Sequence, residues 1–367
     1  MNNQKKYEIF FTVSIKDTLL EEDVEKNVKP LYISEGFERI YHEAHKKKML
    51  PFVAYMMIRI GIDTDQWQPI YDLYQERNTL VKSQLNVVYD AMSKAGVKRI
   101  FVSENYGALL ASGRDLGLFA SGDLDSCADL AEKQKIDEVF ETLGYKKRDR
   151  YSGIAICTTS YHNDDVLPDG FYFGVCWEPL SRLKLPCFIN TNDFVDWDHL
   201  QNAEGTQIKL PTIEALLYIC LMHITLHSFH RAPAIRLYVD ILNCCKNRVI
   251  DWREIYSWAK RDKTVIRMVV SAILANKLAD VQIPDFILAF QSERKVKRIL
   301  SFVYDNHAKC LNGEPGRWGV YNIEILCNDN NGIMGLIKMI FPGSSWLKNH
   351  YGHGIILSTI LHLKNLL

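Results

Sequence analysis

The sequence has no long hydrophobic run and no net charge, and each absence excludes a class of protein. A membrane-spanning helix needs about 18 to 20 consecutive apolar residues, whereas the longest nearly continuous apolar stretch covers only residues 354–361. The 44 lysines and arginines balance the 44 aspartates and glutamates, which argues against a protein that binds nucleic acid through a bulk basic charge. We therefore expect neither a transmembrane segment nor a strong nucleic-acid interaction.

Paired-cysteine motifs and a secretory leader are also missing. The nine cysteines are scattered and none stands in a Cys-x-x-Cys pair, so the sequence predicts neither a zinc ribbon nor a redox dithiol. The first residues carry two lysines but neither an apolar leader core nor a cleavage site of small residues. Reduced thiols fit this cysteine usage best, and we expect a cytoplasmic protein.

The composition is that of a globular protein, and the spacing of hydrophobic residues changes twice along the chain. Apolar residues make up 47% and charged residues 24% of the chain, near the averages for folded domains. The length of 367 residues suggests about two domains, or one large core with lobes. Helical spacing predominates in residues 1–95 and 191–367, and a small α/β centre occupies residues 96–190. The sequence therefore predicts an α+β protein in these three parts.

Short strands and helices alternate in the predicted centre. We expect a strand, a helix, a strand, a helix and two further strands, at residues 97–103, 105–111, from 124, 129–143, 151–159 and 170–177. The basic run at 146–150 is expected to be a solvated turn. The last part is expected to hold helices at residues 212–227, 234–245, 252–260 and 265–279.

The segment 121–125, Ser-Gly-Asp-Leu-Asp, carries the most informative chemical signal. Asp123 and Asp125 are separated by one residue, so in an extended strand both carboxylates lie on the same face. Two converging carboxylates repel each other unless a cation lies between them, and Mg²⁺ typically binds one or two carboxylates together with phosphate oxygens. Transfer of a phosphoryl or nucleotidyl group uses such a metal to orient a triphosphate.

A bare pair of this kind is more often a solvated turn or a helix cap, so its context matters. Here a glycine-rich loop precedes the pair and a predicted helix follows it. Gly122 and Ser121 would let the backbone approach a phosphate closely. We expect catalytic Asp123 and Asp125 to hold Mg²⁺, with Mn²⁺ as an alternative, and Ser121 and Gly122 to face the nucleotide.

Together with Leu143-Gly-Tyr some twenty residues later, this segment resembles the polymerase-β-type nucleotidyltransferase superfamily. More narrowly, it resembles a family of uncharacterised bacterial nucleotidyltransferases. That family has a Lys-Gly helix start, an Arg-x-x-Gly-Asp-Ile-Asp strand, a hairpin that ends in Glu-Leu-His-Trp, and a helical C-terminal part. The resemblance implies a small mixed-sheet nucleotidyltransferase-like core, flanked by N-terminal helices and a C-terminal helical domain.

The second half of the chain continues this resemblance. The family's His-rich helix corresponds to His223 with His227, and its Arg…Asp-Ile step to Arg236 with Asp240-Ile241. Its Asp-Trp helix start corresponds to Asp251-Trp252, and its closing segment to Phe341-Pro342 with Trp346-Leu347. The resemblance is thus expected to extend from about residue 60 to the end. It implies that His227 and Arg236 lie nearest a bound nucleotide.

The residues alone leave other interpretations of this half open. Arg236 and Asp240 have the i,i+4 spacing of a structural ion pair on a helix. His223, His227 and His230 share one helical face, which is compatible with a zinc site, although no acidic residue lies among them.

The chain departs from the family at expected site positions. Ser103-Glu104 replaces the Lys-Gly step, Phe119 replaces the arginine, and Gly174 stands where a third metal carboxylate is expected. A carboxylate at the start of a helix complements the helix dipole, but Glu104 would repel a phosphate there.

Two residues are candidates to compensate for these departures. Glu178 lies four residues beyond Gly174, on the same face if the strand continues, and is the candidate third metal ligand. Arg114 lies in the glycine-rich loop and is the candidate replacement for the missing cation at the nucleotide.

Three interpretations of function follow. The first is a Mg²⁺-dependent nucleotidyltransferase that moves a nucleotidyl group from an NTP to an unknown acceptor, which is a small molecule, a sugar phosphate or a protein. The second is a catalytically inactive nucleotidyltransferase-like protein with a binding or scaffold role. The two missing cations and the missing carboxylate favour it, because each lost charge-assisted contact weakens triphosphate or metal binding by on the order of 1.5–3 kcal/mol. A phosphotransferase on the same fold is a third interpretation.

Overall fold

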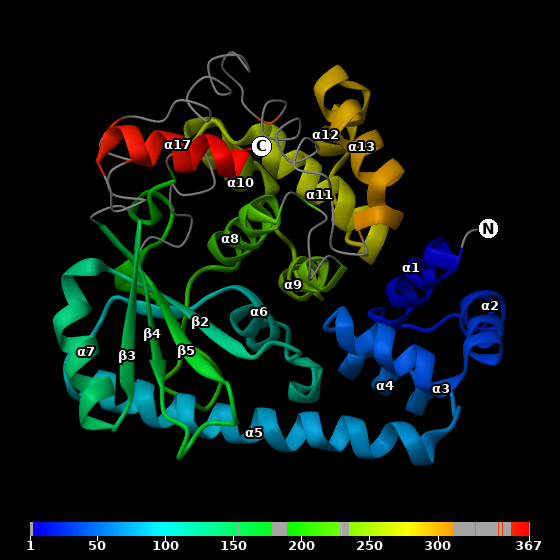
Figure 1. The fold of residues 1–367 in the computed structure, drawn as a ribbon, viewed down its shortest axis with the longest axis horizontal. Helices are drawn as coiled ribbons and strands as arrows, with labels where there is room; N and C mark the ends of the chain where they lie inside the picture. The colour runs from blue at the N-terminus through cyan, green and yellow to red at the C-terminus, as the bar shows by residue number, and fades with distance from the viewer. Residues whose placement is uncertain are drawn as a thin grey trace.

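The N-terminal part of the chain is helical, as predicted (Figure 1). The computed structural model describes residues 3–152, 155–177, 189–227, 229, 235–310, 327, 344, 347 and 354–366. The first helices are α1 (Asn3–Ser14), α2 (Glu21–Asp23) with a π-helical turn (Val24–Val28), α3 (Lys29–Lys46), α4 (Leu50–Arg59) and α5 (Thr64–Lys94). α3 is interrupted at Gly36, whose φ of 75° breaks the helical geometry, a conformation that glycine adopts at little cost.

A five-stranded mixed sheet forms the centre of the described chain. Its strands are β1 (Ile100–Val102), β2 (Asp123–Ala128), β3 (Lys146–Ser152), β4 (Ala155–His162) and β5 (Tyr172–Cys176). They lie in the order β1-β2-β5-β4-β3, with β2 and β5 parallel and the other neighbours antiparallel. The fold is therefore α+β, and its mixed sheet is the one that the family resemblance implies.

One predicted turn is wrong. The basic run that starts at Lys146 is strand β3, at the edge of the sheet. Lys147 pairs with Asp137 of α7 (Lys133–Thr142) at 2.9 Å, and charged side chains are common on edge strands because they hinder pairing with other chains. The strand predicted at 151–159 is accordingly divided, since β3 ends at Ser152 and β4 begins at Ala155.

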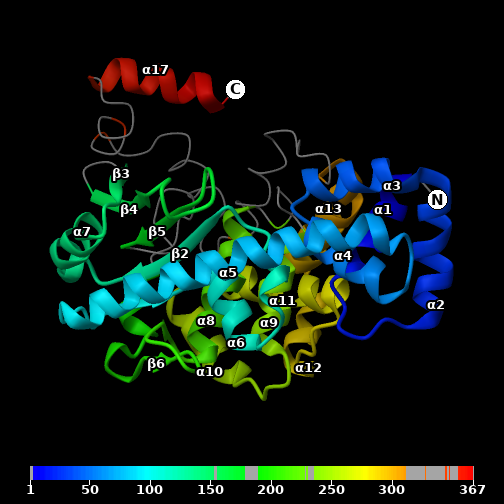
Figure 2. The same cartoon turned by 90° about the horizontal axis from the view of Figure 1, so that it is seen from below.

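Helices α5, α6 (Glu104–Ser112) and α7 bury the apolar side chains of the sheet. In Figures 1 and 2, α5 extends from the sheet to the N-terminal helices. Its second half contributes Val81, Leu85 and Val88 to a core that also contains Leu124 of β2 and Phe140 of α7. The N-terminal helices share another core with the C-terminal helices. The predicted domain boundaries near residues 95 and 190 stay a prediction.

The C-terminal part is again helical, with four helices close to their predicted positions. It contains a short hairpin, β6 (Gln201–Asn202) and β7 (Lys209–Leu210), and the helices α8 (Ile213–Leu226), α9 (Ile235–Cys245), α10 (Trp252–Arg261), α11 (Val265–Ala279), α12 (Asp285–Leu288), α13 (Arg294–Cys310) and α17 (Ile355–Leu366). Asp251 caps α10 by accepting hydrogen bonds from the N–H groups of Arg253 and Glu254, which satisfies donors that a helix start leaves open. Among the described helices, none is both long and apolar enough to cross a membrane.

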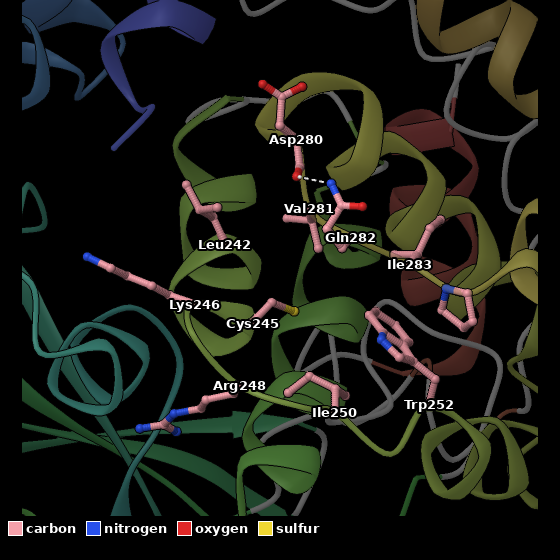
Figure 3. A pocket seen from close by; sticks show the side chains of 11 residues that line it. Leu242, Cys245, Lys246, Arg248, Ile250, Trp252, Asp280, Val281, Gln282 and Ile283 are labelled. Atoms are coloured by element: carbon pink, nitrogen blue, oxygen red, sulfur yellow. Dashed lines mark hydrogen bonds between the residues drawn. The ribbon is translucent and has the colours of Figure 1, made fainter. Parts of the chain in front are cut away.

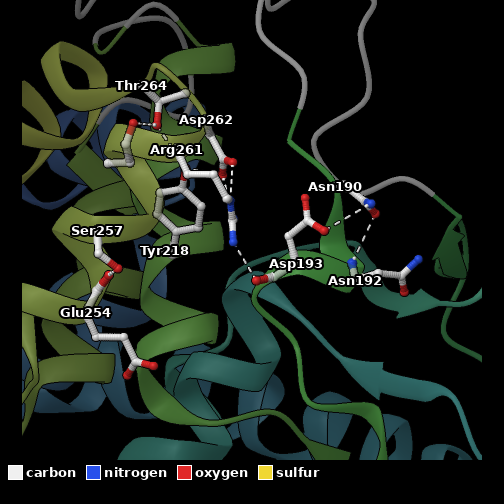
Figure 4. A network of polar contacts seen from close by, with 10 residues as sticks. Asn190, Asn192, Asp193, Tyr218, Glu254, Ser257, Arg261, Asp262 and Thr264 are labelled. Carbon is white, nitrogen blue, oxygen red and sulfur yellow. Dashed lines mark hydrogen bonds and ion pairs between the residues drawn. The ribbon is translucent and has the colours of Figure 1, made fainter.

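A polar network around the buried Asp262 joins the segment after the central sheet to these helices (Figure 4). The Asp262 carboxylate accepts hydrogen bonds from the Tyr218 hydroxyl at 2.9 Å and from Arg261 Nε at 2.8 Å. Arg261 also donates to the main-chain carbonyl of Asp193 at 2.5 Å. Because the Asp262 side chain is only 4% exposed, these partners are what make its charge tolerable there.

Candidate active site

β2 presents the two aspartates on one face, as the sequence predicts. Leu124 between them is fully buried in the sheet core, while Asp123 and Asp125 are half-buried on the opposite side. This follows from the alternation of side chains along a strand. The two carboxylates therefore face the same region, where a bound cation would relieve their mutual repulsion.

Asp123 is held by two hydroxyl groups. Ser121 Oγ donates a hydrogen bond to one carboxylate oxygen at 2.5 Å, and the hydroxyl of Tyr172 donates to the other at 3.1 Å. Tyr172 lies opposite Asp123 in the parallel register of β2 and β5. The sequence reasoning missed Tyr172, because the register that brings it to Asp123 depends on pairing between distant segments. These bonds fix the orientation of the carboxylate, as the partners of metal ligands do.

Asp125 lies between the end of β1 and Gly174 of β5. The main-chain N–H of Ser103 donates to the carbonyl of Asp125 at 2.9 Å. On the other side Gly174 is paired with Asp125, and a Cβ at Gly174 would lie only 2.5 Å from Asp125 Oδ1. β5 therefore offers no carboxylate opposite Asp125, and the Asp125 side chain occupies the space that one would need.

Glu104 follows Ser103 at the start of α6 and is a buried carboxylate close to the aspartates. Its φ of 49° is in the left-handed region, and its side chain is 8% exposed with Oε2 3.1 Å from His223 Nδ1. Burial raises the pKa of Glu104 well above its usual value; the charges of Asp125, Asp240 and Asp123 raise it further, against the effect of Arg236. Sequence reasoning identified Glu104 only as a departure, since neither its burial nor its partner is visible in the local pattern.

Arg236 and Asp240 of α9 form the ion pair that their spacing predicts. Arg236 Nη1 lies 3.6 Å from Asp240 Oδ1, and the two side chains are 6% and 5% exposed. Burial raises the pKa of Asp240 to about 6 despite the Arg236 charge. The buried Nε of Arg236 has no hydrogen-bond partner among the described residues, so one strong donor is left for a ligand.

Comparison of the sequence with known protein families assigns the chain to one of them. Residues 34–280 match the family described as uncharacterised nucleotidyltransferases. The chain belongs to this family. No curated protein and no solved structure matches the chain. Membership gives nucleotidyl transfer as the general activity and a nucleotide as substrate.

The family match differs in extent from the predicted resemblance. It begins before residue 60 and ends at residue 280, so it excludes the segment 341–347 that was compared with the family's closing residues. The bacterial origin that the resemblance suggested stays a prediction.

The histidine-rich helix of this nucleotidyltransferase-family chain is α8. The rings of His223 and His227 lie with their centroids 5.0 Å apart, and His230 lies outside the described residues. Within those residues no group of three or more metal-ligating side chains is placed to hold a metal ion. The described part of the chain therefore does not support the zinc interpretation, and a nucleotide-facing role for His227 stays a prediction.

The remaining predicted site residues have different surroundings. Arg114 is buried and binds the Ile15 carbonyl at 3.2 Å, Asn243 Oδ1 at 3.2 Å and Asp17 at 3.1 Å, contacts that favour a structural role over nucleotide binding. Gly122 faces open space, since a Cβ there would meet nothing within 4 Å. Glu178, the candidate third ligand, lies outside the described residues.

The described carboxylates fit a cation that binds together with its substrate. Asp123 and Asp125 supply two hard oxygen ligands on one face, and two carboxylates with phosphate oxygens are a usual ligand set for Mg²⁺. The open space in front of Gly122 leaves room for a phosphate next to them. The described residues supply only these two carboxylates, which suits Mg²⁺ better than zinc, because zinc sites use three or four protein ligands.

A separate pocket lies between α9 and the segment after α11 (Figure 3). Its volume is about 350 Å³, and Leu242, Cys245, Trp252 and Ile283 are among the residues that line it. Both of its cations have partners elsewhere, since Lys246 pairs with Asp17 at 3.2 Å and Arg248 donates to the Ala111 carbonyl. Both cations that line the pocket therefore have other partners, and neither Asp123 nor Asp125 is among its lining residues.

Proposed function

We propose that this protein transfers a nucleotidyl group from an NTP to an acceptor, with Mg²⁺ or Mn²⁺ held by Asp123 and Asp125. The observation that carries the proposal is the convergence of these two carboxylates on one face of β2, in a chain of the nucleotidyltransferase family. When bound, the cation neutralises developing charge on the phosphates and orients them.

The side chains around the aspartates have defined parts in this proposal. Ser121 and Tyr172 keep the Asp123 carboxylate in one orientation through their hydrogen bonds. The empty space next to Gly122 leaves room for a phosphate close to the backbone. Arg236 offers Nε, which has no partner in the described part of the chain, to a phosphate oxygen. His227, next to His223, completes the nucleotide side. The acceptor is a small molecule, a sugar phosphate or a protein.

The second candidate is an inactive binding or scaffold protein. Two observations favour it: β5 has Gly174 where a third carboxylate is expected, and Ser103-Glu104 stands where the family's Lys-Gly step would supply a cation. The two candidates differ in a simple way, because the binding protein would take up a nucleotide without forming a product.

We also infer a cytoplasmic location. The cysteines that the structure describes are free thiols, namely Cys127, Cys176, Cys220, Cys244, Cys245 and Cys327, which is the state that a reducing compartment maintains.

The first experiment measures binding of each of the four NTPs by calorimetry and thermal shift, with Mg²⁺ or Mn²⁺. It compares the wild type with the double variant Asp123→Asn/Asp125→Asn. A nucleotide at 100 times its Kd stabilises the folded state by about 2.7 kcal/mol, and we expect this shift only with metal present and only in the wild type.

The matched control is Asp164→Asn/Asp165→Asn, which removes two charges from an exposed turn after β4. We expect it to bind the nucleotide like the wild type. Absence of a shift with all four nucleotides in the wild type would contradict the proposal, and so would equal binding by the wild type and the Asp123/Asp125 variant.

A further inference from the structure

Helix α17 carries a group of exposed apolar side chains. Ile355, Ile356, Leu357 and Ile360 lie within half of its length, and each of them is between 43% and 79% exposed. We call these four residues the α17 face. Single exposed apolar side chains are normal on a protein surface, whereas several adjacent ones mark a surface that binds another molecule.

The polarity of α17 is the reverse of that of a helix that packs on a protein core. Such a helix buries its apolar side and exposes its polar side. In α17, Ser358 is fully buried, and it lies on roughly the opposite side of the helix from Ile356, the most exposed member of the α17 face. The sequence keeps the apolar spacing further along the helix, with Leu363 seven residues after Ile356. α17 therefore presents its apolar side outward.

The polar side chain on the same side as the α17 face has its hydrogen bond inside the helix. Thr359 lies between Ile355 and Ile356 around the helix axis, and its hydroxyl donates to the Ile355 carbonyl at 2.8 Å. Such a bond to the preceding turn is common for threonine in helices. The α17 face can therefore leave water without exposing an unpaired hydroxyl donor, which is costly in apolar surroundings.

The length of α17 limits what this face binds. The helix has 12 residues, so at 1.5 Å per residue it is about 18 Å long, whereas the hydrocarbon core of a bilayer is about 30 Å thick. A helix of this length does not cross a bilayer, but it fits in the plane of the bilayer surface with its apolar side toward the lipid chains. In Figure 2, α17 is set apart from the sheet and from the other labelled helices, at the edge of the described molecule.

The sequence around α17 carries positive charge without negative charge. The chain has 44 acidic residues and no net charge, yet no acidic residue occurs after Asp329. The same stretch contains basic residues and histidines, namely Lys338, Lys348, His350, His353, His362 and Lys364. Anionic lipid headgroups attract such a segment, and this attraction adds to the burial of apolar side chains. A second copy of the chain is a poorer partner for the face, because two positive segments repel each other.

We propose that the α17 face binds the surface of a bilayer that contains anionic lipids. The four apolar side chains enter the boundary between headgroups and lipid chains, and the lysines of the same stretch attract the lipid phosphates. This inference is independent of the proposed transfer reaction, and neither depends on the success of the other.

The test measures sedimentation of the whole chain with sucrose-loaded vesicles. One set of vesicles is phosphatidylcholine alone, and the other contains about a third of anionic phosphatidylglycerol. We expect the anionic vesicles to bind the protein at least about tenfold more strongly, because several lysines act together. High salt should reduce this difference, since it screens the charges.

Ile356→Glu/Ile360→Glu tests the α17 face directly. Both side chains are exposed, so we expect an unchanged melting temperature. We expect binding to anionic vesicles to fall at least about thirtyfold, because a charged group resists transfer into the lipid boundary. The matched control Leu73→Glu/Leu80→Glu makes the same change at two exposed leucines of α5, which lies on the other side of the molecule in Figure 1. It should bind within about threefold of the wild type.

Two further variants separate apolar burial from charge. Ile356→Asn/Ile360→Asn removes the apolar groups without adding charge, and we expect it to weaken binding to both kinds of vesicle at least about fivefold. Lys348→Gln/Lys364→Gln removes two positive charges, and we expect it to weaken binding about tenfold to anionic vesicles alone.

Each other outcome overturns the proposal. A wild type that does not sediment with anionic vesicles, or that binds both kinds of vesicle equally, shows that the face does not bind anionic bilayers. Equal binding by the wild type and both Ile356/Ile360 variants shows that the bilayer contacts another surface. Light scattering identifies the competing partner: a dimer of the wild type that the Ile356/Ile360 variants do not form, without vesicle binding, would show that a second copy covers the face.

Discussion

Buried charges dominate the candidate site at the scale of single residues. Glu104, Arg236 and Asp240 are almost completely removed from solvent, and burial of charge is costly unless it is paired. The pairing here is incomplete, since Arg236 Nε lacks a partner among the described residues. Such a group adds little stability, and a ligand that accepts a hydrogen bond from Nε would complete its pairing.

The charge of Asp240 makes stability depend on pH. Its pKa rises from 3.8 to about 6 on folding, so the folded state binds the proton more tightly than the unfolded state. The stabilising effect is fully present below pH 3.8 and is lost as the pH rises to about 6. Relative to Asp240→Asn, which does not titrate, the wild type should lose about 3 kcal/mol of unfolding free energy over this window and then stay level.

Urea denaturation of both proteins at intervals from pH 4 to 8 measures this difference. The asparagine variant controls for titration elsewhere in the chain, except at Glu104 and Cys220, whose pKa values the Asp240 charge raises. A difference in stability that does not change between pH 4 and 6 would show that the Asp240 pKa is not raised by folding.

At the scale of elements, the contact between β1 and α6 brings Glu104 to the aspartates. The sequence predicted both elements within a few residues, because short apolar runs and helical spacing are local patterns. Their close approach is visible in the sequence only as Gly107. A Cβ at that position would lie 2.5 Å from the Val102 carbonyl oxygen and 3.4 Å from Leu216 Cδ1, so α6 can lie against β1 only with glycine there.

Gly107→Ala should therefore destabilise the protein, although alanine favours a helix by about 1 kcal/mol over glycine. The neighbouring atom belongs to the backbone and cannot rotate away, and forced overpacking costs about 1–3 kcal/mol. We expect a lower urea midpoint with an unchanged slope. Gly354→Ala, with nothing within 4 Å of the added methyl group, should change the unfolding free energy by less than about 0.5 kcal/mol; equal effects in the two variants would contradict the steric explanation.

At the scale of the whole molecule, Arg114 joins three distant parts of the chain. It lies after α6 and binds the segment after α1 through Ile15 and Asp17, and α9 through Asn243. These contacts reinforce the core that the N-terminal helices share with the C-terminal helices. Arg114 therefore helps to hold α9, with Arg236 and Asp240, next to α6.

Arg114→Met should destabilise the whole fold. The Arg114 side chain is 4% exposed, and its removal leaves a buried carbonyl and the Asn243 amide without their donor, at a cost of about 2–4 kcal/mol in total. Urea denaturation measures the loss. The control Lys94→Met removes a lysine that is 77% exposed and 2.6 Å from Asp90, a pair of the kind that contributes less than about 1 kcal/mol. A similarly small effect for both variants would show that the Arg114 contacts do not hold the parts together.

The sequence by itself determined the features that depend on local periodicity. A period of two in the segment 121–125 was enough to put Asp123 and Asp125 on one face, and a period near 3.6 located α8, α9, α10 and α11. The basic run of β3 shows the limit of this reasoning, because charged residues on an edge strand have the composition of a turn.

Only the tertiary structure decided which groups surround the aspartates. Tyr172 reaches Asp123 through the parallel register of β2 and β5, and Glu104 reaches His223 through the approach of α6 and α8. Arg114, predicted at the nucleotide, instead has partners in α9 and the N-terminal segment. Such neighbours are set by how distant elements dock, and docking depends on the shape and burial of whole faces, which no local pattern of residues encodes.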